Sequence, residues 1–146
     1  MNKVFRIIIP LLLFTSCINQ KEPPGADLQV GDKIPAFTIE LNDGRLLSHS
    51  DFLKGSWLIC FFNTSCPDCR KELYNLQLAI HNSQLVCIAR EQSAESIERY
   101  WKENGLTLPY SAQTDRAIYN LFATRGIPRI YITQDGIITK AYDDIY

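Results

Sequence analysis

The feature that most constrains this fold is a pair of cysteines that closely follows an apolar run. The run Trp57–Phe62 holds only apolar residues and one cysteine, and a short run of this kind is typical of a buried strand. A loop of three residues leads to Cys66 and Cys69, and Pro67 between them suits the first turn of a helix, where its missing N–H costs nothing. The sequence therefore predicts a strand, a short loop and a helix that begins at two thiols.

The predicted helix has one apolar face. Cys69, Leu73, Leu76 and Ile80 follow one another at helical spacings, so they share that face. Cys66 lies at or just before the first turn, where unpaired N–H groups and the positive end of the helix dipole favour the thiolate. The thiolate is the nucleophile in disulfide exchange. We therefore expect Cys66 to attack a partner disulfide, and Cys69 to resolve the product.

A C-x-x-C pair has two other common uses. One is a structural zinc site, but such a site needs four ligands, and the chain has no second C-x-x-C and only two histidines, His49 and His81. The other is an inert structural disulfide, although closing so short a loop gains little chain entropy. Redox chemistry is favoured, because a C-x-x-C beside a strand and a helix is typical of redox motifs.

The N-terminus predicts export. Lys3 and Arg6 bracket the start of the apolar run Val4–Phe14, which is too short for the roughly 20 apolar residues that span a bilayer. The segment that ends at Cys17 resembles a bacterial lipobox. This resemblance implies a signal peptide over residues 1–16 and a lipid on Cys17, and an ordinary signal peptide with an unmodified cysteine is the alternative.

Composition indicates one globular domain behind this signal. The chain is 46% hydrophobic and 21% charged with a net charge of −1, and no basic stripe in the sequence marks a surface for a nucleic acid or an anionic lipid. The stretch 17–27 is polar and rich in proline and glycine, which predicts a lipid anchor followed by a flexible tether. The domain is expected over residues 28–146.

Alternating patterns and turn residues predict the order of elements in the domain. Short strands are expected at 37–41 and 46–47, joined by a turn at 42–44 and followed by a helical turn at 48–53. After the dithiol helix we expect a strand at 85–89, a helix from Ser93 to about Gly105, and a short helix from 114 or 115 to Gly126. Their inward-facing residues are expected to be Ile97, Tyr100, Trp101, Ile118, Leu121 and Phe122. A hairpin of 129–133 and 137–142 completes a mixed sheet in an α/β sandwich.

Two segments carry a family resemblance. The run Phe61–Leu73, with Cys-Pro-Asp-Cys inside it, resembles the active-site segment of thioredoxin-like proteins of the membrane-tethered TlpA and ResA type. Gly126-Ile127-Pro128, followed by a strand and Asp135-Gly136, resembles the cis-proline loop and hairpin of the same family. The resemblance covers about residues 28–142. It implies a thioredoxin-like α/β/α sandwich with a central mixed sheet, in which the usual final helix is missing because only four residues follow Tyr142.

The resemblance also assigns roles to single residues. It implies a cis bond at Pro128, which leaves the backbone of Ile127 beside the dithiol to pair with an extended partner segment, with Pro67 at the same surface. Glu72 matches an active-site glutamate that handles protons, and a solvated surface acid is the alternative. Ser65 replaces the aromatic residue that usually precedes the first cysteine. Cys60 stands where thioredoxin carries a buried acid.

The activity implied is thiol-disulfide exchange with protein partners, without a cofactor or metal. The family implies a disulfide-bearing protein substrate, a membrane or periplasmic dithiol donor, a periplasm-facing position and reduction as the favoured direction. A peroxiredoxin-like peroxidase is one alternative, although such enzymes place threonine where this chain has Asn63. A copper carrier of the Sco type is another, although its cysteines are one position further apart.

Two further cysteines and the chain end lead to separate expectations. Cys60 and Cys87 lie in apolar strand runs and are expected to be free, buried residues, with a second disulfide between neighbouring strands as the alternative. A missing final helix predicts that part of one sheet face is bare, which would mark an oligomer contact or a partner site.

Overall fold

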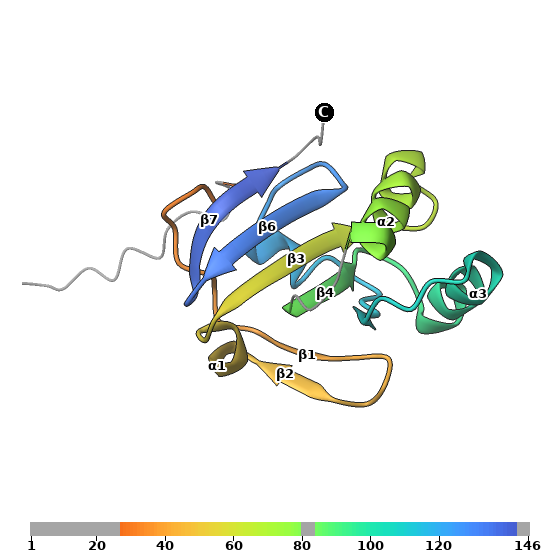
Figure 1. The fold of residues 1–146 in the computed structure, drawn as a ribbon, viewed down its shortest axis with the longest axis horizontal. Coiled ribbons are helices and arrows are strands. Elements are labelled where there is room, and N and C mark those ends of the chain that lie inside the picture. The colour runs from red at the N-terminus through yellow and green to blue at the C-terminus, as the bar shows by residue number, and fades with distance from the viewer. Residues whose placement is uncertain (1–26, 80–83, 143–146) are drawn as a thin grey trace, which may run out of the picture.

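The computed structural model describes residues 27–79 and 84–142. A five-stranded sheet forms its centre, with strands in the order β5-β4-β3-β6-β7 (Figure 1). These strands are β3 (Ser56–Phe62), β4 (Gln84–Ala89), β5 (Tyr110–Ser111), β6 (Arg129–Gln134) and β7 (Ile137–Tyr142). A separate hairpin consists of β1 (Thr38–Glu40) and β2 (Leu46–Ser48). The helices are α1 (His49–Phe52), α2 (Pro67–Ala79), α3 (Ala94–Asn104) and the 3-10 turn η1 (Tyr119–Leu121).

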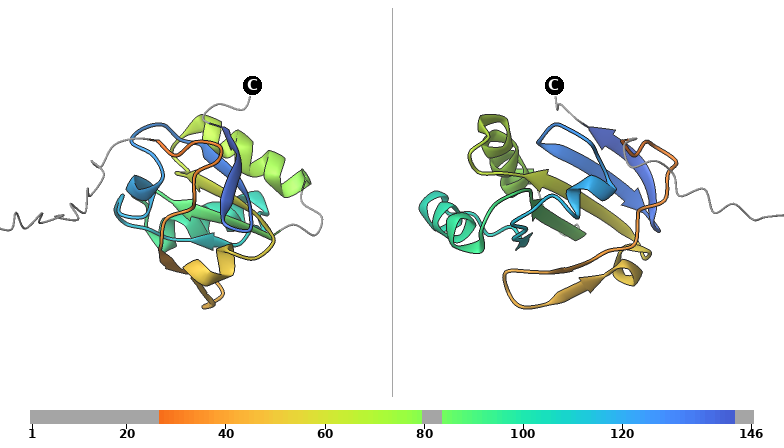
Figure 2. Two further views of the ribbon diagram at one scale, coloured as in Figure 1. Left: turned by 90° about the vertical axis from the view of Figure 1, so that its left-hand side faces the viewer. Right: turned by 180° about the vertical axis from the view of Figure 1, so that it is seen from behind.

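The sheet is mixed, as the sequence predicts. Strands β3, β4 and β5 are parallel, whereas β6 is antiparallel to β3 and pairs with β7 in a hairpin. Each step from β3 to β4 to β5 moves in the same direction across the sheet. Because such crossovers are right-handed, α2 and α3 come to lie on the same face (Figures 1 and 2).

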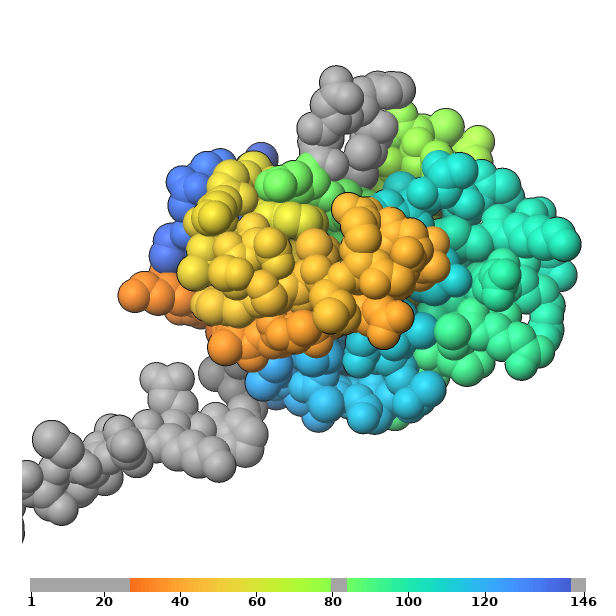
Figure 3. Space-filling view, turned by 90° about the horizontal axis from the view of Figure 1, so that it is seen from below, coloured from red at the N-terminus to blue at the C-terminus, as the bar shows by residue number. Residues whose placement is uncertain are grey.

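The two faces of the sheet have separate cores. In β3, Ile59 and Phe61 point to one face, while Cys60 and Phe62 point to the other. The first core lies under α1, the β1–β2 hairpin and η1, and the ring of Phe61 lies 5.0–6.4 Å from those of Tyr119, Phe122 and Tyr131. Figure 3 shows the hairpin and the segment around η1 closing over this side. The second core lies under α2 and α3. Strand β3 therefore has a packed core on each of its two faces.

Most predicted elements are present with their predicted end signals. Ser48 caps α1 in a capping box with Asp51. Ser93 precedes α3, and its side chain accepts a hydrogen bond from the N–H of Ser96 at 3.3 Å. Gly105 ends α3 in the left-handed conformation at φ 63°, and its N–H donates to the Trp101 carbonyl.

The helix predicted from 114 or 115 to 126 is wrong. Only the single 3-10 turn η1 forms there; Leu121 is 42% exposed, and Tyr119 is the buried residue instead. The cause is tertiary, because the Asp115 carbonyl accepts from the Glu91 N–H at 3.1 Å and the Gln113 carbonyl accepts from the Gln92 N–H at 2.8 Å. These bonds hold the backbone against the loop after β4. Two smaller differences are the unpredicted strand β5 and the half-buried position of Tyr100, which was expected inside.

The described chain begins with a residue that is docked on the domain. The signal peptide, Cys17, the tether up to residue 26 and residues 143–146 lie outside the described residues. The Asp27 carboxylate accepts hydrogen bonds from the Thr124 N–H and Oγ1 at 2.7 and 2.8 Å, and it pairs with Arg129. Burial alone would raise the pKa of Asp27, but these hydrogen bonds and the Arg129 charge outweigh burial and hold it below its ordinary value. Among the helices described, none is long and apolar enough to cross a membrane.

Candidate active site

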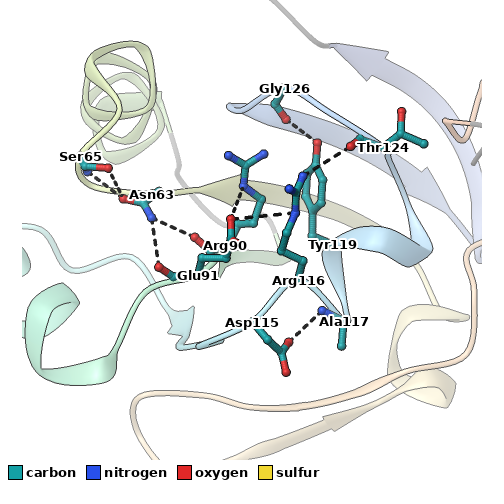
Figure 4. A network of polar contacts seen from close by, with 10 residues as sticks. All are labelled: Asn63, Ser65, Arg90, Glu91, Asp115, Arg116, Ala117, Tyr119, Thr124 and Gly126. Carbon is teal, nitrogen blue, oxygen red and sulfur yellow. Dashed lines mark hydrogen bonds and ion pairs between the residues drawn. The ribbon is translucent and has the colours of Figure 1, made fainter.

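The loop after β3 is held by the side chain of Asn63. Its Nδ2 donates to the Arg90 carbonyl at 2.9 Å, and its Oδ1 accepts from the N–H and Oγ of Ser65 at 2.9 and 2.7 Å (Figure 4). The Asn63 carbonyl accepts from the Cys66 N–H at 3.0 Å. The side chain of Asn63 thus ties the end of β3 to the end of β4, and its carbonyl holds the Cys66 N–H at the start of α2.

The two thiols occupy different environments at the start of α2. Cys66 is half-buried and Cys69 is fully buried, and both are free thiols. The Cys69 N–H donates to the Cys66 sulfur at 3.3 Å. A backbone donor aimed at a sulfur favours its thiolate over its thiol. The arrangement matches the geometry expected from the spacing of the motif.

A second loop closes over the Cys66 sulfur. The peptide bond Ile127–Pro128 is cis, as the resemblance predicts. The Cys66 thiol lies 3.6 Å from the Ile127 carbonyl, to which it can donate. The Tyr119 hydroxyl donates to the Gly126 carbonyl at 2.6 Å and so fixes the start of this loop. The structure therefore brings Cys66, Ile127 and Pro128 together from positions about sixty residues apart.

The Cys69 thiol is difficult to ionise. Burial and the hydrogen bond with Cys66 raise its pKa strongly, while the Asn63 backbone and the positive charge of Arg90 act in the opposite direction. A thiol with a raised pKa is a poor nucleophile until a neighbour removes its proton. Attack by Cys69 therefore depends on the groups around it.

Glu72 is buried one turn after Cys69. Its side chain is 8% exposed, so the alternative of a solvated surface acid is wrong. Burial raises the pKa of Glu72, opposed by a hydrogen bond with Asn75 and by the charge of Lys71. A carboxylate with a raised pKa accepts a proton more readily near neutral pH, which is the property that a general base requires.

Cys60 and Cys87 lie opposite each other on β3 and β4. Both are fully buried and free, so the predicted free cysteines are confirmed and the structure contains no disulfide between them. A hydrogen bond with Cys87, followed by burial, raises the pKa of Cys60 well above its ordinary value. Such a thiol does not act as a nucleophile at neutral pH.

The described part of the chain contains no group of three His, Cys, Asp or Glu side chains placed to hold a metal. His49 lies on α1 in the other layer, and His81 lies outside the described residues. A groove of about 570 Å³ borders the active-site loop and is lined mainly by polar side chains, among them those of Ser65, Arg70, Gln92 and Arg99. A larger hollow of about 720 Å³ lies between the β1–β2 turn and α3, away from both active-site cysteines.

Sequence reasoning missed a cluster of charges beside this site. The guanidinium groups of Arg90 and Arg116 lie over the ring of Tyr119, with their central carbons 5.0 and 5.5 Å from its centre (Figure 4). The carboxylate of Glu91 lies 3.6 Å from the Nε of Arg90 and 3.9 Å from that of Arg116. No local motif joins these residues, because they come from two separate segments.

Comparisons with known proteins agree with this geometry. Residues 30–141 match the model of the AhpC/TSA family. The chain belongs to this family. It is 24% identical over 116 residues to the thiol-disulfide oxidoreductase ResA of Bacillus subtilis (strain 168), an alignment that covers 75% of this chain. The chain spans 65% of the length of that relative.

Solved structures show the same fold. A protein of Bacteroides thetaiotaomicron, provisionally described as a protein disulfide isomerase, superposes with a TM-score of 0.72 at 25% identity, over 84% of this chain and 83% of that chain. StoA of Bacillus subtilis superposes with a TM-score of 0.64 at 22% identity, over 75% of this chain and 88% of its own. The expected thioredoxin-like fold and the resemblance to the TlpA and ResA type are confirmed.

Proposed function

We propose that this protein is a thiol-disulfide oxidoreductase that exchanges disulfides with protein partners through Cys66 and Cys69. The observation that carries the proposal is the unequal setting of the two sulfurs. Cys66 is half-buried, receives the Cys69 N–H and lies against the cis-proline loop, whereas Cys69 is buried beneath it. The match to the AhpC/TSA family and the likeness to ResA support the same chemistry.

The first step joins the protein to its partner. The Cys66 thiolate attacks one sulfur of the partner disulfide, a bond forms between those two sulfurs, and the second partner sulfur leaves as a thiolate that takes up a proton. The donor N–H of Cys69 supports the attacking thiolate before the step. The backbone of Ile127 lies beside the new bond and can pair with an extended partner segment that passes Pro67.

The second step releases the partner. Cys69 loses its proton and attacks the Cys66 sulfur; the Cys66–Cys69 disulfide forms, and the partner leaves with two electrons and takes up a proton. Glu72 is the proton acceptor in this proposal, because it is buried one turn along α2 and has a raised pKa. No cofactor is required, because the dithiol itself carries the electrons.

We further propose that the protein works as a reductant, facing the periplasm on a lipid attached to Cys17. These points rest on the resemblance of the sequence to membrane-tethered relatives and to a lipobox. A membrane or periplasmic dithiol would return the electrons. Replacing Cys17 with serine should move the protein from the membrane fraction to the soluble fraction of fractionated cells. Unchanged membrane association would contradict the lipid anchor.

The exchange itself is tested by trapping the mixed disulfide. Cys69→Ser leaves Cys66 able to attack but removes the second step, so adducts on Cys66 should accumulate in cells. They are detected on non-reducing gels and identified by mass spectrometry. The matched control is the double variant Cys66→Ser/Cys69→Ser, which should show none. If no adduct forms on Cys66, the proposed role of this residue is wrong.

The peroxidase alternative is tested separately. Asn63, which stands where peroxidases of this kind place threonine, uses its side chain to hold the active-site loop. We expect little hydrogen peroxide consumption by the wild type and no further loss in Cys66→Ser. Rapid consumption that disappears in Cys66→Ser would favour the peroxidase.

A further inference from the structure

We propose that Asp27 is a positioning residue for the cis-proline loop, and that it favours attack by Cys66 on disulfides carried by an extended peptide chain over attack on small disulfides. The inference rests on the proposed exchange reaction. Asp27 acts through the loop and does not touch the reacting sulfurs. Three features of the structure support it: the contacts of the Asp27 carboxylate, the way Arg129 extends them, and the position of the loop against Cys66.

The Asp27 carboxylate binds on both sides of the cis-proline loop. Its Oδ1 accepts from the N–H and the Oγ1 of Thr124 at 2.7 and 2.8 Å, and its Oδ2 accepts from the guanidinium of Arg129. Thr124 lies two residues before Gly126, and Arg129 directly follows Pro128. One carboxylate therefore joins the two ends of the loop at its base.

These contacts are shielded from solvent. The side chain of Arg129 is 8% exposed and that of Asp27 is 22% exposed. Ion pairs between exposed side chains contribute little, whereas hydrogen bonds to a charged group in a mostly buried place are among the stronger ones in proteins. The carboxylate of Asp27 is thus a restraint on the loop rather than one member of a surface ion pair.

Arg129 extends the restraint into the loop. Its guanidinium donates to the Arg125 carbonyl at 2.9 Å as well as to the carboxylate of Asp27, which therefore orients it. The next carbonyl along the chain, that of Gly126, accepts from the Tyr119 hydroxyl (Figure 4). Side chains thus hold two successive carbonyls that lead into the cis peptide bond, and one of these side chains depends on Asp27.

The position of the loop matters because Ile127 faces the attacking sulfur. The Ile127 carbonyl lies 3.6 Å from the thiol of Cys66. In the proposed exchange the backbone of Ile127 pairs with an extended partner segment. A loop that becomes ordered only when the partner binds loses conformational entropy in that step, and binding is weaker. A small disulfide has no backbone to pair, so a looser loop should affect it less.

The Asp27 carboxylate can be removed without releasing the chain beside it. The N–H of Leu28 donates to the Phe122 carbonyl at 2.8 Å, and the Leu28 side chain packs against the core under η1. Asp27→Ala therefore removes the bonds to Thr124 and Arg129 while Leu28 still fixes the start of the domain.

Asp32→Ala is the matched control. Asp32 belongs to the same entry segment, and its Oδ2 accepts from the Gln29 N–H at 2.7 Å. Its backbone carbonyl accepts from the N–H of Ile138 on β7, and this bond remains in the variant. The change removes a carboxylate of the same kind that holds a local turn instead of the cis-proline loop.

Two disulfides with the same leaving group separate the effect on a peptide from the effect on reactivity. One is dipyridyl disulfide. The other is a capped peptide of two alanines, a cysteine and two alanines, whose cysteine sulfur is bonded to thiopyridine. When the Cys66 thiolate attacks, it forms a bond to the peptide sulfur or to one pyridyl sulfur, and the disulfide bond to the other thiopyridine breaks. The released thiopyridone takes up a proton and absorbs light, so stopped-flow absorbance gives a second-order rate constant from the initial phase.

Asp27→Ala should lower the ratio of the peptide rate constant to the dipyridyl rate constant about fivefold, which corresponds to the loss of about one net hydrogen bond of loop order. Asp27→Asn keeps the size of the side chain and should also lower the ratio, so it serves if Asp27→Ala does not fold. Asp32→Ala should leave the ratio unchanged. Thermal unfolding shows that each variant is folded at the temperature of the assay.

Each outcome decides between these readings. An unchanged ratio in the folded Asp27 variants would overturn the inference, and so would an equal fall in Asp32→Ala, because it would indicate a general effect of the entry segment. Thiopyridone release by wild type that is no faster than release by Cys66→Ser would instead overturn the proposed exchange reaction. A lower ratio in the Asp27 variants, with the control unchanged, would establish the role of Asp27.

Discussion

The side chain of Asn63 should contribute measurably to both stability and reactivity. Asn63→Ala removes four hydrogen bonds, two to the carbonyls of Arg90 and Glu91 and two from Ser65. A net contribution of about 0.5–1.5 kcal/mol for each bond, reduced because the site is partly exposed, predicts a loss of about 2 kcal/mol in the free energy of unfolding. The loop that places Cys66 would lose these restraints and keep those on Thr64 from Gln92 and Arg70, so the attack by Cys66 should also slow.

Urea unfolding followed by tryptophan fluorescence measures the loss, with the m-value as a check that both states are unchanged. Asn104→Ala is the control, because Asn104 makes one exposed hydrogen bond, to the Tyr100 carbonyl at 2.9 Å. It should change the unfolding free energy by no more than about 0.5 kcal/mol. If Asn63→Ala is as stable as Asn104→Ala, the loop is not held by this side chain, and the argument for its role is refuted.

Three further predictions follow from burial and charge. The fold raises the pKa of Glu72 above the ordinary value of 4.5, so ionisation of Glu72 lowers the stability of the protein as the pH rises above that value. Glu72→Gln should therefore be more stable than wild type at neutral pH and equally stable in acid. Thermal unfolding at several pH values measures the difference. The pKa of Asp27 is lowered, so Asp27→Asn should lose stability at neutral pH, and the difference should shrink as the pH falls toward and below 3.8; a constant difference would count against the charge. Leu73→Ala should cost about 2–5 kcal/mol in urea unfolding because Leu73 is fully buried, whereas Leu78→Ala on the same helix, at a residue 61% exposed, should change it by no more than about 0.5 kcal/mol.

Glu72 supplies the buried acid of this site from a helix rather than from a strand. Where thioredoxin carries a buried acid on the strand, this chain has Cys60, which is neutral and fully buried. Glu72 is a buried acid on α2, one turn after Cys69, and its charge acts on Cys60. In our proposal it accepts the proton of Cys69. Burial of an acid costs stability, so Glu72 marks a site that gives up some stability for reactivity.

Much of the site could be predicted from neighbouring residues alone. The spacing of Cys69, Leu73 and Leu76 indicates a helix with a buried face, and Pro67 marks where it begins. The closing hairpin is indicated by Asp135-Gly136 between two alternating runs. These features are local, because helix and strand geometry alone decides which neighbours share a face.

Other features depend on contacts between distant segments. The turn η1 replaces a predicted helix because the backbone at Asp115 bonds to Glu91, and β5 is a strand of two residues that exists only because β4 lies beside it. A pattern within one segment cannot reveal these contacts. They arise when crossovers bring the ends of the strands together.

The sequence by itself determined the order of the elements, the position of the dithiol at the start of a helix, and which of its two sulfurs is buried. The family resemblance of the sequence also indicated the cis-proline loop beside Cys66, whereas the tertiary structure alone decided the burial of Glu72 and the position of Arg90 over Tyr119. The physical reason is that backbone periodicity acts over a few residues, whereas the ionisation of a thiol depends on every charge and donor that the fold brings near it.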